Sequence, residues 1–178
     1  MSQFKTIDRE SADGLAKDLL DQLHHQLGMV PNVYAVMAQA PTTLAAQLAL
    51  TEHLSNGTLS AKLNEKIALV VSNDNSCGYC VAAHSAIAAR LGMSDEEIVA
   101  AQKGKSKDPV EQAVLNLAIS INGNHGHGDN SAVRRALDAG LSEAQIVEIV
   151  GQVVKNIMTN SINGIANTTI DFPEREMF

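Results

Sequence analysis

Apolar residues recur at the spacing of an α-helix along most of this chain. Between residues 12 and 27 they stand at Leu15, Leu19, Leu20, Leu23 and Leu27, and the next residue is a glycine, which commonly ends a helix. Similar patterns, bounded by capping or breaking residues, predict further helices over 30–37, 42–55, 60–72, 76–91, 95–103, 109–121, 130–139 and 143–159. The polar, glycine-rich residues 122–129 predict a loop. The sequence therefore predicts an all-α fold, a helical bundle.

One of these helices is expected to lie in the middle of the bundle. Ser60 is placed to cap it, and the run from Ile67 to Val71 makes it apolar on nearly every side, although a buried strand is the alternative for that run. Only 3% of the residues are aromatic, so the core must consist of aliphatic side chains and alanine. That composition favours close-packed helices over an aromatic-rich β-sandwich.

Two later helix starts carry the spacing of a capping box. Ser94 is followed three residues later by Glu97, and Ser142 by Gln145. We expect these serines to begin helices rather than to serve an active site.

The length of 178 residues suits one domain or two small, tightly joined halves, and we expect a single helical domain over residues 1–178. Displacing the sequence by 83 positions aligns Glu65 with Glu148, and it sets three reactive residues against asparagines: Cys77 against Asn160, Cys80 against Asn163 and His84 against Asn167. This alignment indicates a degenerate internal helical repeat, with its second copy over about 143–169 and neutral polar residues in place of the reactive ones.

The charge pattern excludes two classes of partner. The formal net charge is −7 and the sequence has no basic run, so it lacks the positive surface that nucleic acids or anionic membranes require. No window holds about 18 uninterrupted apolar residues, and the first residues do not resemble a cleavable targeting segment. We therefore expect a cytoplasmic protein that binds neither nucleic acid nor membrane.

The two cysteines, Cys77 and Cys80, are the residues that point to chemistry. Two cysteines three positions apart in a reducing compartment indicate redox or metal chemistry rather than a disulfide scaffold. On a helix that begins near Ser76, both sulfurs and His84 would project from one face within about 60°. His84 lies one turn beyond Cys80, within about 6 Å, and two turns beyond Cys77.

These positions suggest different roles for the two sulfurs. The helix N-terminus and exposure favour ionisation of Cys77, whereas the neighbouring base favours Cys80. We assign the attack on an oxidised substrate to Cys80 and the resolving role to Cys77. Glu65, at the start of the preceding helix, could orient His84 or relay its proton; the alternative is a solvated carboxylate beside Lys66.

The string from Glu65 to His84, Glu-x11-Cys-x2-Cys-x3-His, resembles the active-site signature of alkylhydroperoxidase AhpD-like proteins in the carboxymuconolactone decarboxylase family. The resemblance also covers the segments 30–33, 92–98 and 140–146, and so extends over about 28–172, with the active-site segment at about 60–92.

The resemblance implies an all-α homo-oligomer that reduces alkyl hydroperoxides with electrons from a thiol or disulfide reductant protein. Cys80 would attack, Cys77 would resolve, and Glu65 and His84 would relay a proton. Some members have a histidine immediately before the second cysteine, where this chain has Tyr79, which leaves open whether the relay reaches Cys77. Decarboxylases of the family generally lack the cysteine pair, so a decarboxylase is an alternative that the pair disfavours.

Other readings of these residues remain. The cysteines with His84 could bind zinc in a structural protein, or could sense oxidation without turnover. The tract of His125, His127 and Asp129 resembles a short metal-binding sequence but is expected to be a solvated loop. The sequence has neither a glycine-rich phosphate loop after a strand nor a Gly-x-Ser-x-Gly elbow, so nucleotide binding and serine hydrolase chemistry lack support. No cofactor is expected.

Overall fold

The structure is a computed structural model that describes residues 2–127 and 130–178. Within these residues every regular element is a helix, which confirms the predicted all-α fold. The helices are α1 (Gly14–Leu27), α2 (Asn32–Met37), α3 (Pro41–Ser55), α4 (Ala61–Asp74), α5 (Gly78–Arg90), α6 (Asp95–Gln102), α7 (Pro109–Asn124), α8 (Asn130–Asp138) and α9 (Glu143–Ala166).

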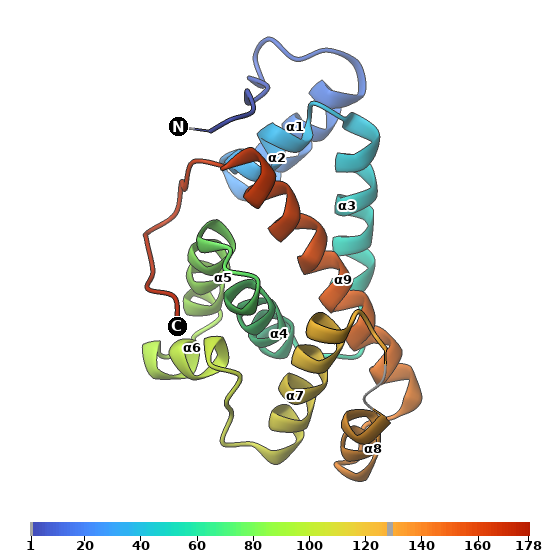
Figure 1. Cartoon of the computed structure of the whole chain (residues 1–178). Helices are drawn as coiled ribbons and strands as arrows, with labels where there is room; N and C mark the ends of the chain where they lie inside the picture. Colours follow the sequence, from blue (N-terminus) through green and yellow to red (C-terminus); the bar gives the residue numbers. More distant parts are fainter. Residues whose placement is uncertain (1, 128–129) are drawn as a thin grey trace.

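Helix α4 lies at the centre of the bundle, as its apolar run predicts, and the alternative of a strand there is wrong. It packs against α5, α6, α7 and α9 (Figure 1). The side chains from Ile67 to Val71 are all buried, since each of these faces a neighbouring helix. A second apolar cluster joins α1, α2 and α3 to the start of α5, and it contains both cysteines.

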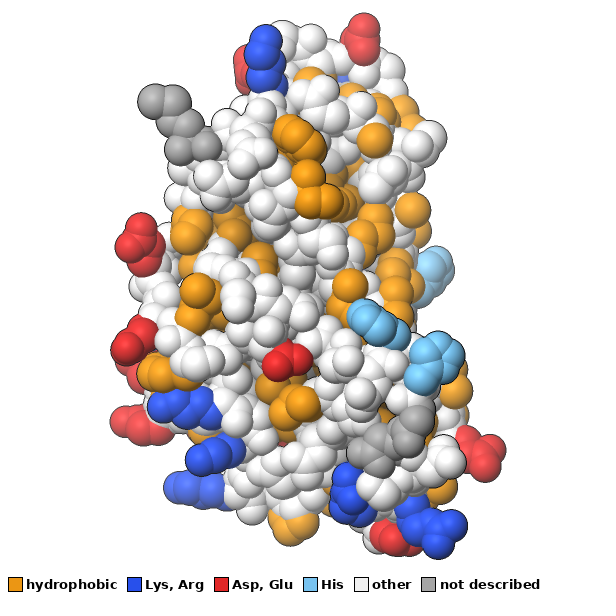
Figure 2. All heavy atoms as spheres, in the orientation of Figure 1, with side chains coloured by type: hydrophobic (Ala, Val, Ile, Leu, Met, Phe, Trp, Pro, Cys, Tyr) orange, Lys and Arg blue, Asp and Glu red, His pale blue; other side chains and the backbone are white. Residues whose placement is uncertain are grey.

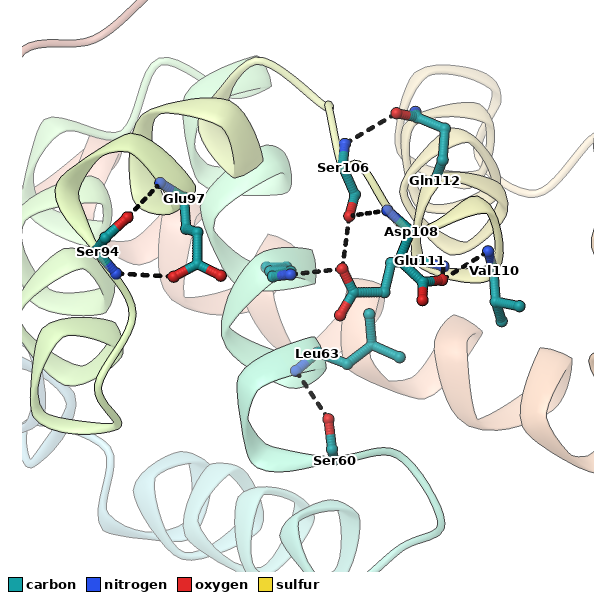
Figure 3. Close-up of polar contacts among 10 residues, drawn as sticks. Ser60, Leu63, Ser94, Glu97, Ser106, Asp108, Val110, Glu111 and Gln112 are labelled. Atoms are coloured by element: carbon teal, nitrogen blue, oxygen red, sulfur yellow. Dashed lines mark hydrogen bonds and ion pairs between the residues drawn. The ribbon is translucent and has the colours of Figure 1, made fainter.

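The predicted caps are present at the starts of α4, α6 and α9. Ser60 Oγ accepts a hydrogen bond from the Leu63 N–H at 3.2 Å. Ser94 and Glu97 exchange the two hydrogen bonds of a capping box, as Figure 3 shows. The helix starts are thus set by local sequence, as in isolated helices.

Helix α7 ends later than the sequence predicts. Residues 122–124, predicted to begin a loop, form its last turn, and His125 follows in a left-handed conformation with φ of 53°. The Asn122 side chain is buried and donates to Asp74 Oδ2 at 2.5 Å and to Asn75 Oδ1 at 3.0 Å. These contacts with α4 stabilise helical backbone that composition alone disfavours. Gly128 and Asp129, at the end of the predicted loop, lie outside the described residues.

Helix α9 also runs further than predicted, to Ala166 instead of 159. Its last two turns contain Asn160 and Asn163, whose buried amides bond to groups on α4 and α5. Because α9 is unbroken, it differs from the matching segment 60–84, where two helices meet at residues 75–77. The internal repeat stays a prediction from sequence.

The residues after α9 fold back over the bundle. Figure 1 shows this segment passing α5 and ending near α6. The ring of Phe172 meets that of Tyr79 edge to face, with centroids 5.8 Å apart. Further along, Arg175 pairs with Asp95 at 3.0 Å, and the Phe178 N–H donates to Asn73 Oδ1 at 2.9 Å.

Charged side chains on the face drawn in Figure 2 gather mainly at its lower and left edges, with hydrophobic side chains exposed between them. None of the helices in the described ranges is long and apolar enough to span a bilayer.

Candidate active site

The two cysteines stand where α4 ends and α5 begins. Ser76 adopts a left-handed φ of 54°, which turns the chain sharply between the helices. Cys77 is the N-cap of α5, with its sulfur accepting a hydrogen bond from the Cys80 N–H at 3.3 Å. The cysteines form a disulfide across a Cα–Cα distance of 5.3 Å. Cys77 thus lies just outside the helical face on which the sequence places it, while Cys80 is within the helix.

Glu65 and His84 meet across the interface between α4 and α5. His84 Nδ1 lies 2.8 Å from Glu65 Oε2, and both side chains are more than four-fifths buried. With the carboxylate ionised, Nδ1 carries the proton and Nε2 is the free basic nitrogen. The alternative of a solvated Glu65 beside Lys66 is wrong, because the Glu65 side chain is buried against His84, while Lys66 pairs with Glu111 at 2.5 Å.

A pocket of about 280 Å³ opens beside Cys80. Cys80 and His84 both line it, whereas Cys77 does not. Most of the remaining wall is apolar, with contributions from Leu27, Met29, Pro31, Val33, Ile87 and Phe172. One of the two sulfurs and the histidine therefore face a common, largely apolar space.

Tyr79, at the position where some AhpD-like proteins have a histidine, has a packing role here. Its hydroxyl accepts a hydrogen bond from the Val33 N–H at 3.2 Å, and its ring contacts Phe172. Burial raises the pKa of Tyr79 far above the usual value, although the bond from Val33 opposes that shift. The residue joins α5 to α2 and stays a neutral phenol.

The structure adds residues that sequence reasoning did not assign to the site. Asn163 of α9 donates from Nδ2 to Cys80 Sγ at 3.2 Å. The displacement by 83 aligned these two residues but carried no signal that they touch.

Tyr34 lines the pocket, and burial together with the charge of Glu65 raises the pKa of its phenol. Burial lowers the pKa of Lys155, and Glu65 partly opposes this. Distant segments thus share one electrostatic environment around Glu65.

The residues proposed as metal ligands from sequence do not form a cluster in the described part of the chain. No group of three or more His, Cys, Asp or Glu side chains is arranged to hold an ion within these residues. In the disulfide, the sulfurs of Cys77 and Cys80 are bonded to each other and are not thiolate ligands. His125 and His127 are exposed beside α7, and Asp129 lies outside the described residues.

Comparison with known proteins gives a family and a fold. Residues 37–104, which include Glu65, both cysteines and His84, match the model of the carboxymuconolactone decarboxylase family. No curated protein matches the sequence.

Several solved structures share the fold over nearly the whole chain. An AhpD-core, peroxidase-related protein from Ralstonia eutropha JMP134 superposes with a TM-score of 0.86 at 19% identity, covering 96% of this chain and 92% of its own. A peroxidase-related protein from Silicibacter sp. TM1040 gives 0.79 at 24% identity, with coverage of 95% and 94%. The debrominase Bmp8, solved with 2,3,4-tribromopyrrole, gives 0.79 at 22% identity, with coverage of 93% and 90%.

At these identities the structural likeness establishes the fold, and the family match covers the segment that carries the cysteine pair. The chain thus has the fold of AhpD-core and peroxidase-related structures, and its residues 37–104 are similar to the carboxymuconolactone decarboxylase family.

Proposed function

We propose that the protein is a thiol-dependent hydroperoxide reductase in which Cys80 attacks the substrate and Cys77 resolves the product. The observation that carries this proposal is that Cys80 lines the pocket together with His84, while Cys77 does not. The apolar wall suits an organic hydroperoxide with a hydrocarbon body.

The first half of the reaction oxidises Cys80. His84, held by Glu65 through Nδ1, takes the proton of the Cys80 thiol, and the thiolate attacks the terminal oxygen of the hydroperoxide. The oxygen–oxygen bond breaks, and the leaving alkoxide takes the proton back from His84 to become an alcohol. Cys80 is left as a sulfenic acid. Glu65 stabilises the imidazolium that exists between the two proton transfers, as the carboxylate of a catalytic triad does.

The second half closes the disulfide and then reduces it. The Cys77 thiol attacks the sulfenic sulfur of Cys80, which releases water and forms the bond seen in the structure. A reductant protein with a thiol pair supplies two electrons and two protons, by thiol–disulfide exchange, to restore both thiols. The expected partners are thus a hydroperoxide, a thiol reductant and further copies of the chain in a homo-oligomer.

Mass spectrometry after one equivalent of cumene hydroperoxide tests the order of the sulfurs. The Cys77→Ser variant should consume one equivalent and retain a sulfenic acid on Cys80, and the Cys80→Ser variant should consume none. A sulfenic acid on Cys77 in the Cys80→Ser protein, formed at the wild-type rate, would reverse the assignment. Absence of oxidation in the reduced wild-type protein would instead support a structural role for the pair.

A further inference from the structure

The amide of Asn163 is buried against the sulfur that we assign to substrate attack. Its Nδ2 donates to Cys80 Sγ at 3.2 Å, and the residue is 5% exposed. Its Oδ1 is buried and has no hydrogen-bond partner among the described residues, and the residue lines the pocket. The nitrogen of the amide is therefore bonded to the sulfur, while its oxygen is a buried acceptor without a partner in the described part of the chain.

Neighbouring contacts hold this part of α9 in place. Asn160, one turn earlier, donates to Ser72 Oγ at 3.3 Å and accepts from Asn75 Nδ2 at 2.9 Å, so it is bonded to α4 and the residue after it. Asn163 thus lies on a helix that is anchored to the segment just before the disulfide. An unpaired buried acceptor is costly in a folded protein unless a ligand or water supplies the missing donor.

We propose that Asn163 is a catalytic residue, whose N–H stabilises the Cys80 thiolate and whose Oδ1 accepts a hydrogen bond from the terminal O–H of the hydroperoxide. This inference rests on the proposed function. The terminal oxygen that donates this hydrogen bond to Oδ1 is the oxygen that the thiolate attacks. It keeps its hydrogen when it becomes part of the sulfenic acid. The same hydrogen bond can therefore persist from substrate to intermediate, and it orients the oxygen toward the sulfur.

The thiolate part of the proposal can be measured without any peroxide. In a Cys77→Ser background, the pH midpoint of Cys80 alkylation by iodoacetamide reports formation of the thiolate. Asn163→Ala should raise this midpoint by about one to two pH units, the effect of losing one hydrogen bond to a charged group. Gln152→Ala is the matched control, because it removes a buried amide from the same helix that bonds to Leu54 O and does not line the pocket, and it should leave the midpoint unchanged.

The acceptor part needs a comparison of two reagents. At a pH where Cys80 is fully ionised, Asn163→Ala should lower the rate with cumene hydroperoxide, relative to the rate with iodoacetamide, by about tenfold or more. Asn163→Asp keeps the shape and an acceptor oxygen but lacks the N–H donor. It should therefore raise the alkylation midpoint and preserve the ratio of the cumene hydroperoxide rate to the iodoacetamide rate. It also provides the test if Asn163→Ala does not fold.

An unchanged midpoint in both Asn163 variants, or an equal rise in Gln152→Ala, would overturn the role for the N–H. An unchanged ratio of rates in Asn163→Ala would overturn the role for Oδ1. If alkylation depends on Asn163 but reduced wild-type protein does not react with hydroperoxide, the proposed function fails and the thiolate contact stands.

Discussion

The 2.8 Å contact between His84 Nδ1 and Glu65 Oε2 determines which imidazole nitrogen is free for proton transfer. The carboxylate comes from α4 and the histidine from α5, so the packing of these helices sets the protonation pattern of the ring. This pairing leads to the first prediction.

His84→Gln should slow the reaction of Cys80 with hydroperoxide at neutral pH by about 10²–10⁴-fold, because it removes the general base. Glu65→Gln should act in the same direction, and the double variant should be little slower than His84→Gln, since the two residues work as one unit. Stopped-flow single-turnover measurements provide the rates. His53→Gln, which changes an exposed histidine, serves as the control. Multiplicative losses in the double variant would show that Glu65 acts independently of His84.

Tyr79→Phe should destabilise the protein with little effect on the chemistry. The buried Val33 N–H would lose its acceptor, a loss of about 1–3 kcal/mol in the free energy of unfolding. Chemical denaturation would report the stability, and the single-turnover rate would report the chemistry. A large fall in rate with unchanged stability would indicate that the phenol takes part in proton transfer.

The stability that Glu148 contributes should depend on pH in the acid range. Its carboxylate, on α9, accepts hydrogen bonds from Thr58 N–H at 2.9 Å, Thr58 Oγ1 at 2.7 Å and Leu59 N–H at 3.1 Å. Burial alone would raise the pKa of Glu148, but these bonds outweigh it and hold the pKa below the ordinary 4.5. The contribution is therefore complete above about pH 4.5 and is lost as the pH falls through the lower pKa of the folded state.

Glu148→Gln should accordingly cost about 1 kcal/mol at neutral pH, and the difference from wild type should shrink toward pH 3. Urea denaturation at several pH values measures this, with Glu52→Gln, a change at an exposed glutamate, as the control. A difference that stays constant down to pH 3 would show that the charge of Glu148 is not what anchors the connection between α3 and α4.

Sedimentation should show a particle larger than the 18.9 kDa of one chain. Large apolar side chains remain exposed around the pocket, among them Leu27, Met29 and Ile87. Covering such side chains in an interface between identical chains would remove them from water. Sedimentation equilibrium at micromolar concentration measures the mass, and a value of one chain mass would contradict the prediction.

The sequence predicted the features that depend on local pattern. The cap at Ser60, the capping boxes at Ser94 and Ser142, and the buried run in α4 follow from residue types a few positions apart. The pairing of Glu65 with His84 could be predicted from the sequence because a short connection joins their helices.

Other features depend on contacts between segments far apart in the chain. The ends of α7 and α9 extend because Asn122, Asn160 and Asn163 find partners on α4 and α5, and asparagine is a weak helix former, so its presence does not predict a helix. The contact between Asn163 and Cys80 spans 83 positions. Such contacts become visible only when the packing of α9 against α5 is known.

The wall of the pocket also has a consequence for synthesis on the ribosome. It is drawn from residues as distant as Leu27 and Phe172, whereas Glu65, Cys80 and His84 lie within twenty positions of one another. A nascent chain can bring acid, base and thiol together as soon as α4 and α5 have emerged. The pocket is completed only when α9 and Phe172 follow, so Cys80 acquires its full set of neighbours only after nearly the whole chain has been made.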